Sequence, residues 1–218
     1  MLLAEGLQHC FGSVRALDDV SFTVQPGQTL AVFGPNGAGK TTLLKVLAGL
    51  IRPQRGRVLV EGGRRAVGWI GHQPQLYSQL TVRENLHFWA SLYDVAVPGD
   101  LLSRFGLTEY ADRAVRALSR GLVQRVAIAR ALVHDPAVLL LDEPFTGLDR
   151  TAAEAFSGLI AQHAAAGRAT VLVTHDVEEG AGLATDVAFM RAGRLVHFAP
   201  RGRRAPAQVA EEYRNAIA

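Results

Sequence analysis

The chain has 218 residues, a length typical of one large domain or of a domain with a small insertion. Hydrophobic residues make up 49% and charged residues 20%, a balance that supports a sizeable core and excludes a disordered chain. The net charge of +3 is too small to indicate nucleic-acid binding by itself. The single cysteine, Cys10, excludes an internal disulfide and fits a reducing compartment. The longest apolar runs fall far short of the roughly 18 residues of a membrane span, and we expect no signal peptide.

Short apolar runs separated by turn residues predict strands in the first third of the chain. The predicted strands are Leu2–Leu7, Val20–Val24, Thr29–Phe33, Arg57–Val60 and Val67–Ile70. Gly12 with Ser13, and Pro26 with Gly27, are predicted to turn the chain between the first three of them.

The middle of the chain is predicted to be helical. Thr81 and Glu84 have the spacing of a capping box, so a helix is expected to start there and to end before Pro98 and Gly99. Further helices are predicted at Leu101–Phe105 and Tyr110–Ala117. Residues from about 74 to 118 therefore form a predicted helical insert between parts that contain strands.

The last part of the chain alternates predicted helices with buried strands. The expected elements are a helix from Ser119 to His134, a strand at Val138–Leu141, a helix at Ala152–Ala166, a strand at Thr170–Val173, a hairpin of Val187–Met190 and Leu195–Phe198 around Ala192 and Gly193, and a helix after Pro206. This alternation predicts an α/β fold whose mostly parallel sheet has helices on both faces.

A glycine-rich loop stands between the predicted strand at 29–33 and an apolar run with helical spacing. It consists of Gly34, Pro35, Asn36, Gly37, Ala38, Gly39, Lys40, Thr41 and Thr42, the G-x-x-x-x-G-K-T pattern of a P-loop. Glycines allow successive N–H groups to point at an anion, and a following helix adds partial positive charge. Lys40 would bind the β- and γ-phosphates of a nucleotide, and the Thr41 hydroxyl would hold Mg²⁺. The alternative is a chance glycine loop before a helix.

Two adjacent carboxylates follow the predicted strand at 138–141. Asp142, at the end of that strand, suits Mg²⁺, and Glu143, one residue further, suits a general base that deprotonates an attacking water. The alternative is a pair of acids that cap a surface turn.

Other polar residues stand just beyond predicted strands or at a helix start. Ser119 and Gly121 could form a second phosphate cradle, although a serine at this place is often only an N-cap. Gln73, His175 and Asp149 each follow a strand, and ligands of open parallel sheets bind beyond the carboxyl ends of the strands.

These residues and their order resemble the ATP-binding-cassette (ABC) ATPases over nearly the whole chain. The resemblance implies a single domain, residues 1–218, with a P-loop NTPase core, an antiparallel β subdomain and a helical subdomain insert at about 74–118. Gly34–Thr42 would be the Walker A loop and Val138–Asp142 the Walker B strand. Glu143 would be the catalytic glutamate, His175 the switch histidine, and Gln73 the Q-loop glutamine that joins Thr41 and Asp142 around Mg²⁺.

The resemblance also implies ATP as ligand and a paired arrangement of two cassettes, identical or paralogous. Each ATP would lie between the P-loop of one subunit and the signature of the other, here Ser119–Gln124, with Asp149 as the D-loop aspartate. The family signature is Leu-Ser-Gly-Gly-Gln, from which Arg120 and Leu122 depart. Phe11 would stack on adenine, or could equally be a core residue.

A narrower resemblance, to the ATPase subunit of bacterial haem exporters of cytochrome c biogenesis, rests on Trp69–Pro74 and Leu80–Phe88. It implies an integral membrane partner and a peripheral position on the cytoplasmic face of the inner membrane. A drug, polysaccharide or lipid exporter is the alternative. A soluble ABC protein of DNA repair or translation fits less well, because only the basic stretch Arg201–Arg204 favours it, so no nucleic-acid partner is expected. A module that binds nucleotide without hydrolysing it conflicts with intact Glu143 and His175.

Overall fold

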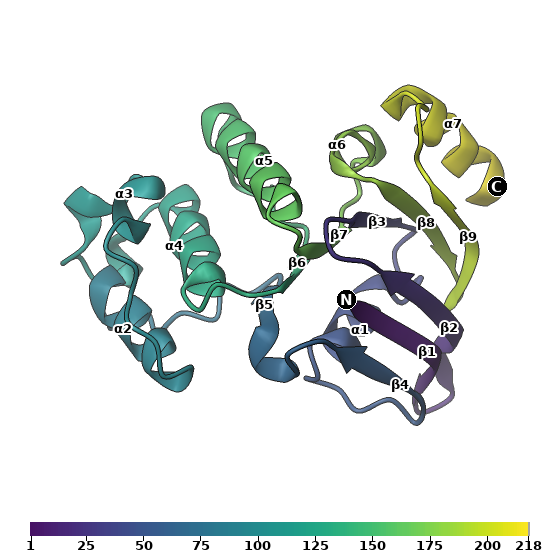
Figure 1. The fold of residues 1–218 in the computed structure, drawn as a ribbon, viewed down its shortest axis with the longest axis horizontal. Helices are drawn as coiled ribbons and strands as arrows, with labels where there is room; N and C mark the ends of the chain where they lie inside the picture. The colour runs from purple at the N-terminus through teal and green to yellow at the C-terminus, as the bar shows by residue number, and fades with distance from the viewer. Residues whose placement is uncertain (218) are drawn as a thin grey trace.

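Two β-sheets form the centre of the protein in the computed structural model, which describes residues 1–217 (Figure 1). The antiparallel sheet has the strand order β2-β1-β4, formed by β1 (Leu2–Phe11), β2 (Val14–Val24) and β4 (Arg55–Val60). The second sheet has the order β5-β6-β7-β3-β8-β9, formed by β3 (Thr29–Phe33), β5 (Val67–Ile70), β6 (Val138–Asp142), β7 (Ala169–Val173), β8 (Asp186–Arg191) and β9 (Arg194–Pro200). Its first five strands in this order are parallel, and β9 pairs antiparallel with β8.

The helices either pack against the six-stranded sheet or form a separate helical part. They are α1 (Lys40–Leu47), α2 (Val82–Leu92), α3 (Leu101–Arg104), α4 (Arg120–Leu132), α5 (Arg150–Ala165), α6 (Val177–Leu183) and α7 (Pro206–Ile217), with short 3₁₀ turns at Arg64–Ala66, Thr108–Tyr110 and Val115–Ala117. Alternating strands and helices with a mostly parallel sheet confirm the predicted α/β class.

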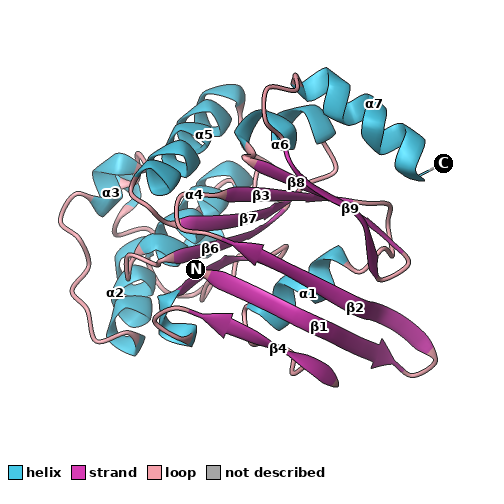
Figure 2. Ribbon diagram, turned by 45° about the vertical axis from the view of Figure 1, so that its right-hand side comes forward, coloured by secondary structure: helices cyan, strands magenta, loops and turns pink. Residues whose placement is uncertain are grey.

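The parallel sheet is buried on both faces, which explains why its strands are continuous apolar runs. In β6, Leu140 packs into the cluster shared with α1 and the antiparallel sheet, whereas Leu139 and Leu141 pack against Phe156 and Ile160 of α5. Figure 2 shows this arrangement: the antiparallel sheet and α1 lie on one side of the six-stranded sheet, and α5 and α6 lie on the other. The carboxyl ends of β3, β6 and β7 thereby meet at one edge.

The helical part packs around its own apolar cluster, away from the two sheets (Figure 1). The capping box at the start of α2 is present, with Thr81 Oγ1 accepting from the Glu84 N–H and Glu84 accepting from the Thr81 N–H. Leu86 of α2 shares the cluster with Val126 of α4, so the apolar contacts of this part continue beyond the predicted insert at about 74–118 into α4.

The prediction of a helix over Tyr110–Ala117 is wrong. This segment instead runs beside the start of α2, where the Val82 N–H donates to the Arg113 carbonyl and the Val115 N–H to the Leu80 carbonyl. These hydrogen bonds and a β-bridge between Thr81 and Ala114 pair the segment with the start of α2 instead of allowing helical hydrogen bonds. Only 3₁₀ turns form at the two ends of the segment. The predicted helix from Ser119 to His134 is confirmed but ends at Leu132.

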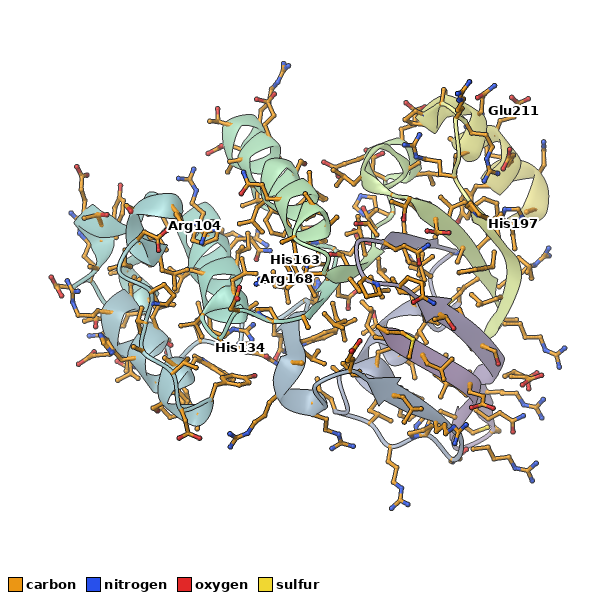
Figure 3. All side chains as sticks on the ribbon, in the orientation of Figure 1. Arg104, His134, His163, Arg168, His197 and Glu211 are labelled. Carbon is orange, nitrogen blue, oxygen red and sulfur yellow. The ribbon has the colours of Figure 1, made fainter. Side chains whose placement is uncertain are left out.

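His163, labelled on α5 in Figure 3, gives stability a predictable pH dependence. Its Nε2 lies 3.0 Å from the Pro136 carbonyl and its Nδ1 lies 3.2 Å from Thr170 Oγ1. A carbonyl can only accept, so Nε2 carries a proton, and burial favours the neutral ring over the charged one. Burial lowers the pKa of His163 below its usual 6.5, an effect that the Pro136 hydrogen bond opposes.

The unfolded chain therefore binds the extra proton first, and the stabilisation by neutral His163 is present above pH ~6.5 and lost as the pH falls. We expect the free energy of unfolding to fall between pH 7.5 and 5.5, by up to about 1.4 kcal/mol per pH unit for this proton. Urea unfolding at several pH values, for the parent and for His163→Gln, gives the free energy of unfolding as a function of pH. We expect this free energy to change less with pH in the variant. The same pH dependence of the unfolding free energy in both proteins would contradict this role for His163.

Candidate functional site

The glycine-rich loop turns between β3 and α1 in a conformation that two glycines make possible. Gly39, the residue before α1, has φ 103°, and a Cβ there would lie 2.2 Å from the Ala16 carbonyl oxygen. At Gly34 a Cβ would lie 2.4 Å from the carbonyl oxygen of Met190 on β8. The loop is therefore packed tightly against β2 and β8 and holds its N–H groups at the helix start, as a phosphate cradle requires.

Lys40 is the charged group of this loop. Its ammonium donates to the carbonyls of Gly34 (2.6 Å) and Pro35 (3.0 Å), so it lies across the mouth of the loop. Burial lowers the pKa of Lys40, and the negative charges of Glu143 and Asp142 oppose that shift. The ammonium is thus held beside both carboxylates that follow β6.

A cavity of about 310 Å³ opens over the loop. Residues Asn36 to Thr42 line it together with Val14, Ala16, His72, Asp142, Glu143 and Val173. Its donors are a lysine ammonium, the N–H groups of a helix start and two threonine hydroxyls, and its acceptors are two carboxylates. This set fits the phosphate chain of a nucleotide, with an acceptor side for a metal ion or a water.

Asp142 ends β6 and is 4% exposed. Burial raises the pKa of its carboxyl, and a hydrogen bond with Thr41 acts in the opposite direction. One carboxylate beside one hydroxyl, both facing the phosphate cradle, fits Mg²⁺, which is commonly bound by one or two carboxylates together with substrate phosphates. Within residues 1–217 no group of three or more His, Cys, Asp or Glu side chains gathers around a possible metal position.

Glu143 and His175 form a direct pair. His175 Nδ1 donates to Glu143 Oε2 over 2.7 Å, from the ends of two neighbouring strands. Glu143 has φ 51°, a left-handed conformation that is unfavourable for a side chain with a Cβ, and its N–H donates to the Val173 carbonyl over 2.9 Å. The surrounding strands thus hold this carboxylate at the cavity in a strained backbone position.

Gln73 lies in a neighbouring cavity of about 490 Å³, which Thr41 and Asp142 also line. His72, which the sequence analysis left out, lines both this cavity and the one over the P-loop. Its position two residues after β5, directly before Gln73, is the signal that could have identified it.

Ser119, Gly121 and Asp149 lie apart from the cavity over the P-loop. Ser119 is the N-cap of α4 and accepts from the Leu122 N–H at 3.4 Å; Asp149 is the N-cap of α5 and accepts from the Ala152 N–H at 2.8 Å. Arg125 joins the two helix starts through its ion pair with Asp149 at 3.2 Å.

Phe11 closes β1 beside the turn at Gly12 and is 52% exposed, so it is not a core residue. Its ring contacts His9 edge to face, with the centroids 4.7 Å apart. Val14 and Ala16 of the same hairpin line the cavity over the P-loop, whereas Phe11 does not.

Contacts between α4 and α2 connect the helical part to the segment that contains Gln73. The Arg130 guanidinium lies 4.9 Å from the centre of the Trp89 ring and donates to the Pro74 carbonyl at 3.4 Å. Burial lowers the pKa of Arg130 to about 10. His134, labelled in Figure 3, stacks on Tyr93 with the ring centroids 3.7 Å apart. Arg130 lies on α4 and His134 lies just after it, so both partners come from a segment far from α2 in the sequence.

Leu122, a departure from the family signature, packs against the apolar cluster of the helical part. The groups at the start of α4 that could donate to a phosphate are main-chain N–H groups and the Ser119 hydroxyl, and they do not depend on the side chain at 122. We therefore expect Leu122→Gln to change kcat/KM by less than about tenfold, equivalent to ~1.4 kcal/mol.

Ser119→Arg removes the hydroxyl and adds bulk, so it should reduce ATPase activity much further. Steady-state ATPase assays of both variants test this, with thermal unfolding as the control for folding. A hundredfold gain in Leu122→Gln with parent activity in Ser119→Arg would contradict a role for this segment.

The amino-acid sequence is similar to those of known ATP-binding proteins of transporters. The family described as "ABC transporter" matches residues 17–146. The chain is 36% identical over 200 residues to the ABC transporter ATP-binding protein NatA of Bacillus subtilis, covering 84% of this chain and 81% of that protein. It is 41% identical over 217 residues to the cobalt import ATP-binding protein CbiO of Rhodobacter capsulatus, covering 90% and 77%. It is also 41% identical over 191 residues to the cytochrome c biogenesis ATP-binding export protein CcmA 2 of Salmonella paratyphi A, covering 83% and 92%.

Solved structures of ATP-binding cassettes have the same fold as this chain. An ATP-binding subunit of an ABC transporter superposes with a TM-score of 0.90 at 27% identity, covering 98% of this chain and 99% of that one. A dimeric ATP-binding cassette in a post-hydrolysis state, bound to ADP and Pi, superposes with a TM-score of 0.82 at 26% identity, covering 92% and 98%.

Proposed function

Because the chain belongs to the ABC transporter family, as an ATP-binding subunit that hydrolyses ATP, we propose that it powers transport through a separate membrane subunit. The observation that carries this is the joint placement of the phosphate cradle, Asp142 and Glu143 at one cavity, with His175 hydrogen-bonded to Glu143. The predicted fold class agrees with the family's structures.

The residues at the cavity divide into proposed roles. The P-loop N–H groups and Lys40 bind the β- and γ-phosphates. Thr41 and Asp142 hold Mg²⁺, with Gln73 from the neighbouring cavity, and the metal would supply charge neutralisation at the phosphates. Glu143 accepts a proton from the attacking water, and His175 orients that carboxylate through the 2.7 Å hydrogen bond.

A second cassette completes the site in this proposal. Ser119, Gly121 and Asp149 stand outside the P-loop cavity of their own chain, at the starts of two helices whose N–H groups are suited to an anion. Support comes from the solved dimeric cassette bound to ADP and Pi, which has the same fold. The partner would be a second copy or a paralogue.

The membrane subunit would dock near Gln73, where Lys45 and Leu50 of the α1 end line the same cavity. Leu50 is 57% exposed there. Across residues 1–217, none of the helices combines the length and the apolarity needed to traverse a bilayer. The proposed location is peripheral, on the cytoplasmic face of the inner membrane.

For the cargo we propose haem export in cytochrome c biogenesis. The support is the 41% identity to the export protein CcmA 2, over 92% of that protein, together with the resemblance of Trp69–Pro74 and Leu80–Phe88 to haem-exporter ATPases. An importer is the second candidate, because the cobalt import protein CbiO is equally identical. The identity of the membrane subunit distinguishes haem export from import.

Affinity purification of the tagged chain from its own membranes tests both levels of the proposal. We expect an integral membrane protein to co-purify and to raise the ATPase activity of the chain in proteoliposomes. Deletion of the gene should abolish cytochrome c maturation if the cargo is haem, whereas loss of a metal-uptake phenotype would favour import. Recovery from the soluble fraction alone, without a membrane protein, would contradict the proposal.

A further inference from the structure

A basic cavity lies between the end of α1 and β4, at the opposite end of α1 from the P-loop cavity. We call it the basic cavity; its volume is about 500 Å³, and Arg52, Arg57 and Arg64 are among the residues that line it. Part of its wall is apolar, with Leu47 and Ile51 at the α1 end and Val58 on β4. Among residues 1–217, neither an acidic nor an aromatic side chain belongs to the lining.

The arginines of this region outnumber the acids near them. Residues 52–65 hold five arginines, at 52, 55, 57, 64 and 65, and a single acid, Glu61, which binds the terminal amine of Met1 at 3.1 Å. Arg57 is paired with Glu5 at 2.7 Å. The guanidinium groups of Arg52 and Arg64 have no hydrogen-bond or ion-pair partner within residues 1–217. The basic cavity thus offers two free guanidinium groups beside an apolar wall.

This combination fits an amphiphilic anion. A guanidinium fork binds phosphate through two parallel N–H donors, and the apolar wall suits the beginning of a hydrocarbon chain. A nucleotide fits less well, because no aromatic ring of the lining offers a surface for a base.

The basic cavity also lies next to the proposed docking site of the membrane subunit. Lys45 and Leu50 line the Gln73 cavity, whereas Val46, Leu47 and Ile51 line the basic cavity. The two cavities therefore meet around the C-terminal end of α1. A subunit docked at Gln73 would bring the free arginines close to the lipid surface.

We propose that the basic cavity binds the phosphate group of an anionic phospholipid, through Arg52 and Arg64, and so holds the cassette against the membrane beside its partner. This inference rests on the proposed function, which places the chain at a membrane. Anionic lipids attract each arginine near the surface with a contribution equivalent to about fivefold in binding.

The test is co-sedimentation of the full chain with vesicles of phosphatidylglycerol and of phosphatidylcholine. We expect binding to phosphatidylglycerol only, reduced about 25-fold in Arg52→Gln/Arg64→Gln. The matched control is Arg203→Gln/Arg214→Gln, which removes the same charge near α7, on the opposite side of the molecule from β4 in Figures 1 and 2. The control should bind within twofold of the parent, and basal ATPase activity should be unchanged in both variants.

Titration with inorganic phosphate distinguishes a free anion from a lipid. Saturable phosphate binding that depends on Arg52 and Arg64, without vesicle binding, would overturn the lipid proposal. Equal binding to both vesicle types, or equal losses in the two double variants, would overturn it too. If a membrane protein co-purifies but vesicle binding is absent, only this inference fails; if none co-purifies, the proposed function fails.

Discussion

Glu143→Gln is expected to lower kcat for ATP hydrolysis at least about 100-fold, equivalent to ~2.7 kcal/mol, while ATP affinity stays within about threefold of the parent. The amide keeps the size of the side chain and its place at the end of β6, but it cannot accept a proton from water. The strained backbone at φ 51° is the same in both proteins, so folding should change little. The ATP-bound form should therefore persist.

Three measurements check this result: single-turnover hydrolysis, nucleotide binding by fluorescence, and size-exclusion chromatography with ATP, in which the variant should elute as a dimer. The matched control is Glu179→Gln. Glu179 is a neighbouring carboxylate on α6 whose pKa is raised, first by burial and then by the charge of Asp176. Removing its charge without touching the proposed base should leave kcat within about threefold. Parent activity in Glu143→Gln, or an equal loss in both variants, would remove Glu143 from the proposed role.

Motifs formed by residues close together in the sequence could be predicted. They lie at the ends of the strands and at the helix start where the sequence pattern placed them. The P-loop depends on glycines at fixed offsets, and Asp142, Glu143 and His175 follow apolar runs that form neighbouring parallel strands. Once those strands pair, their carboxyl ends meet, so the cavity follows from the order of the elements. The roles of its residues remain predictions until variants are measured.

Features that depend on distant partners could not be predicted in this way. Residues 110–117 have helical composition, but their backbone bonds with the start of α2 prevail over that preference. Helix α6 was missed because two glycines weaken its pattern; Gly180 is required there because a Cβ would lie 2.7 Å from the Phe33 ring. In the sequence, Arg130 has the pattern of an ordinary charged residue on a helix. Only the fold shows that its guanidinium contacts the Trp89 ring and donates to the Pro74 carbonyl.

The P-loop geometry predicts that Gly39→Ala abolishes nucleotide binding and destabilises the fold. Gly39 has φ 103°, which alanine adopts at a cost of about 1–2 kcal/mol, and its Cβ would lie 2.2 Å from the Ala16 carbonyl oxygen. A main-chain oxygen in β2 cannot rotate away, so the loop must shift, at a further cost of about 1–3 kcal/mol. The expected total of about 2–5 kcal/mol lowers Tm by about 4–20 °C in a chain of this size.

Gly37→Ala is the matched control, since Gly37 lies in the same loop with φ 80° but has no atom within 4 Å of a Cβ. Alanine there should cost only the unfavourable backbone conformation, about 1–2 kcal/mol, and lower Tm by about 2–8 °C. Thermal unfolding separates the two variants without requiring activity, and ATP titration then shows whether Gly39→Ala has lost the cradle. Equal Tm values for the two variants would mean that contact with Ala16 does not shape the loop. The close packing of the loop against β2 would then not be the reason for glycine at this position.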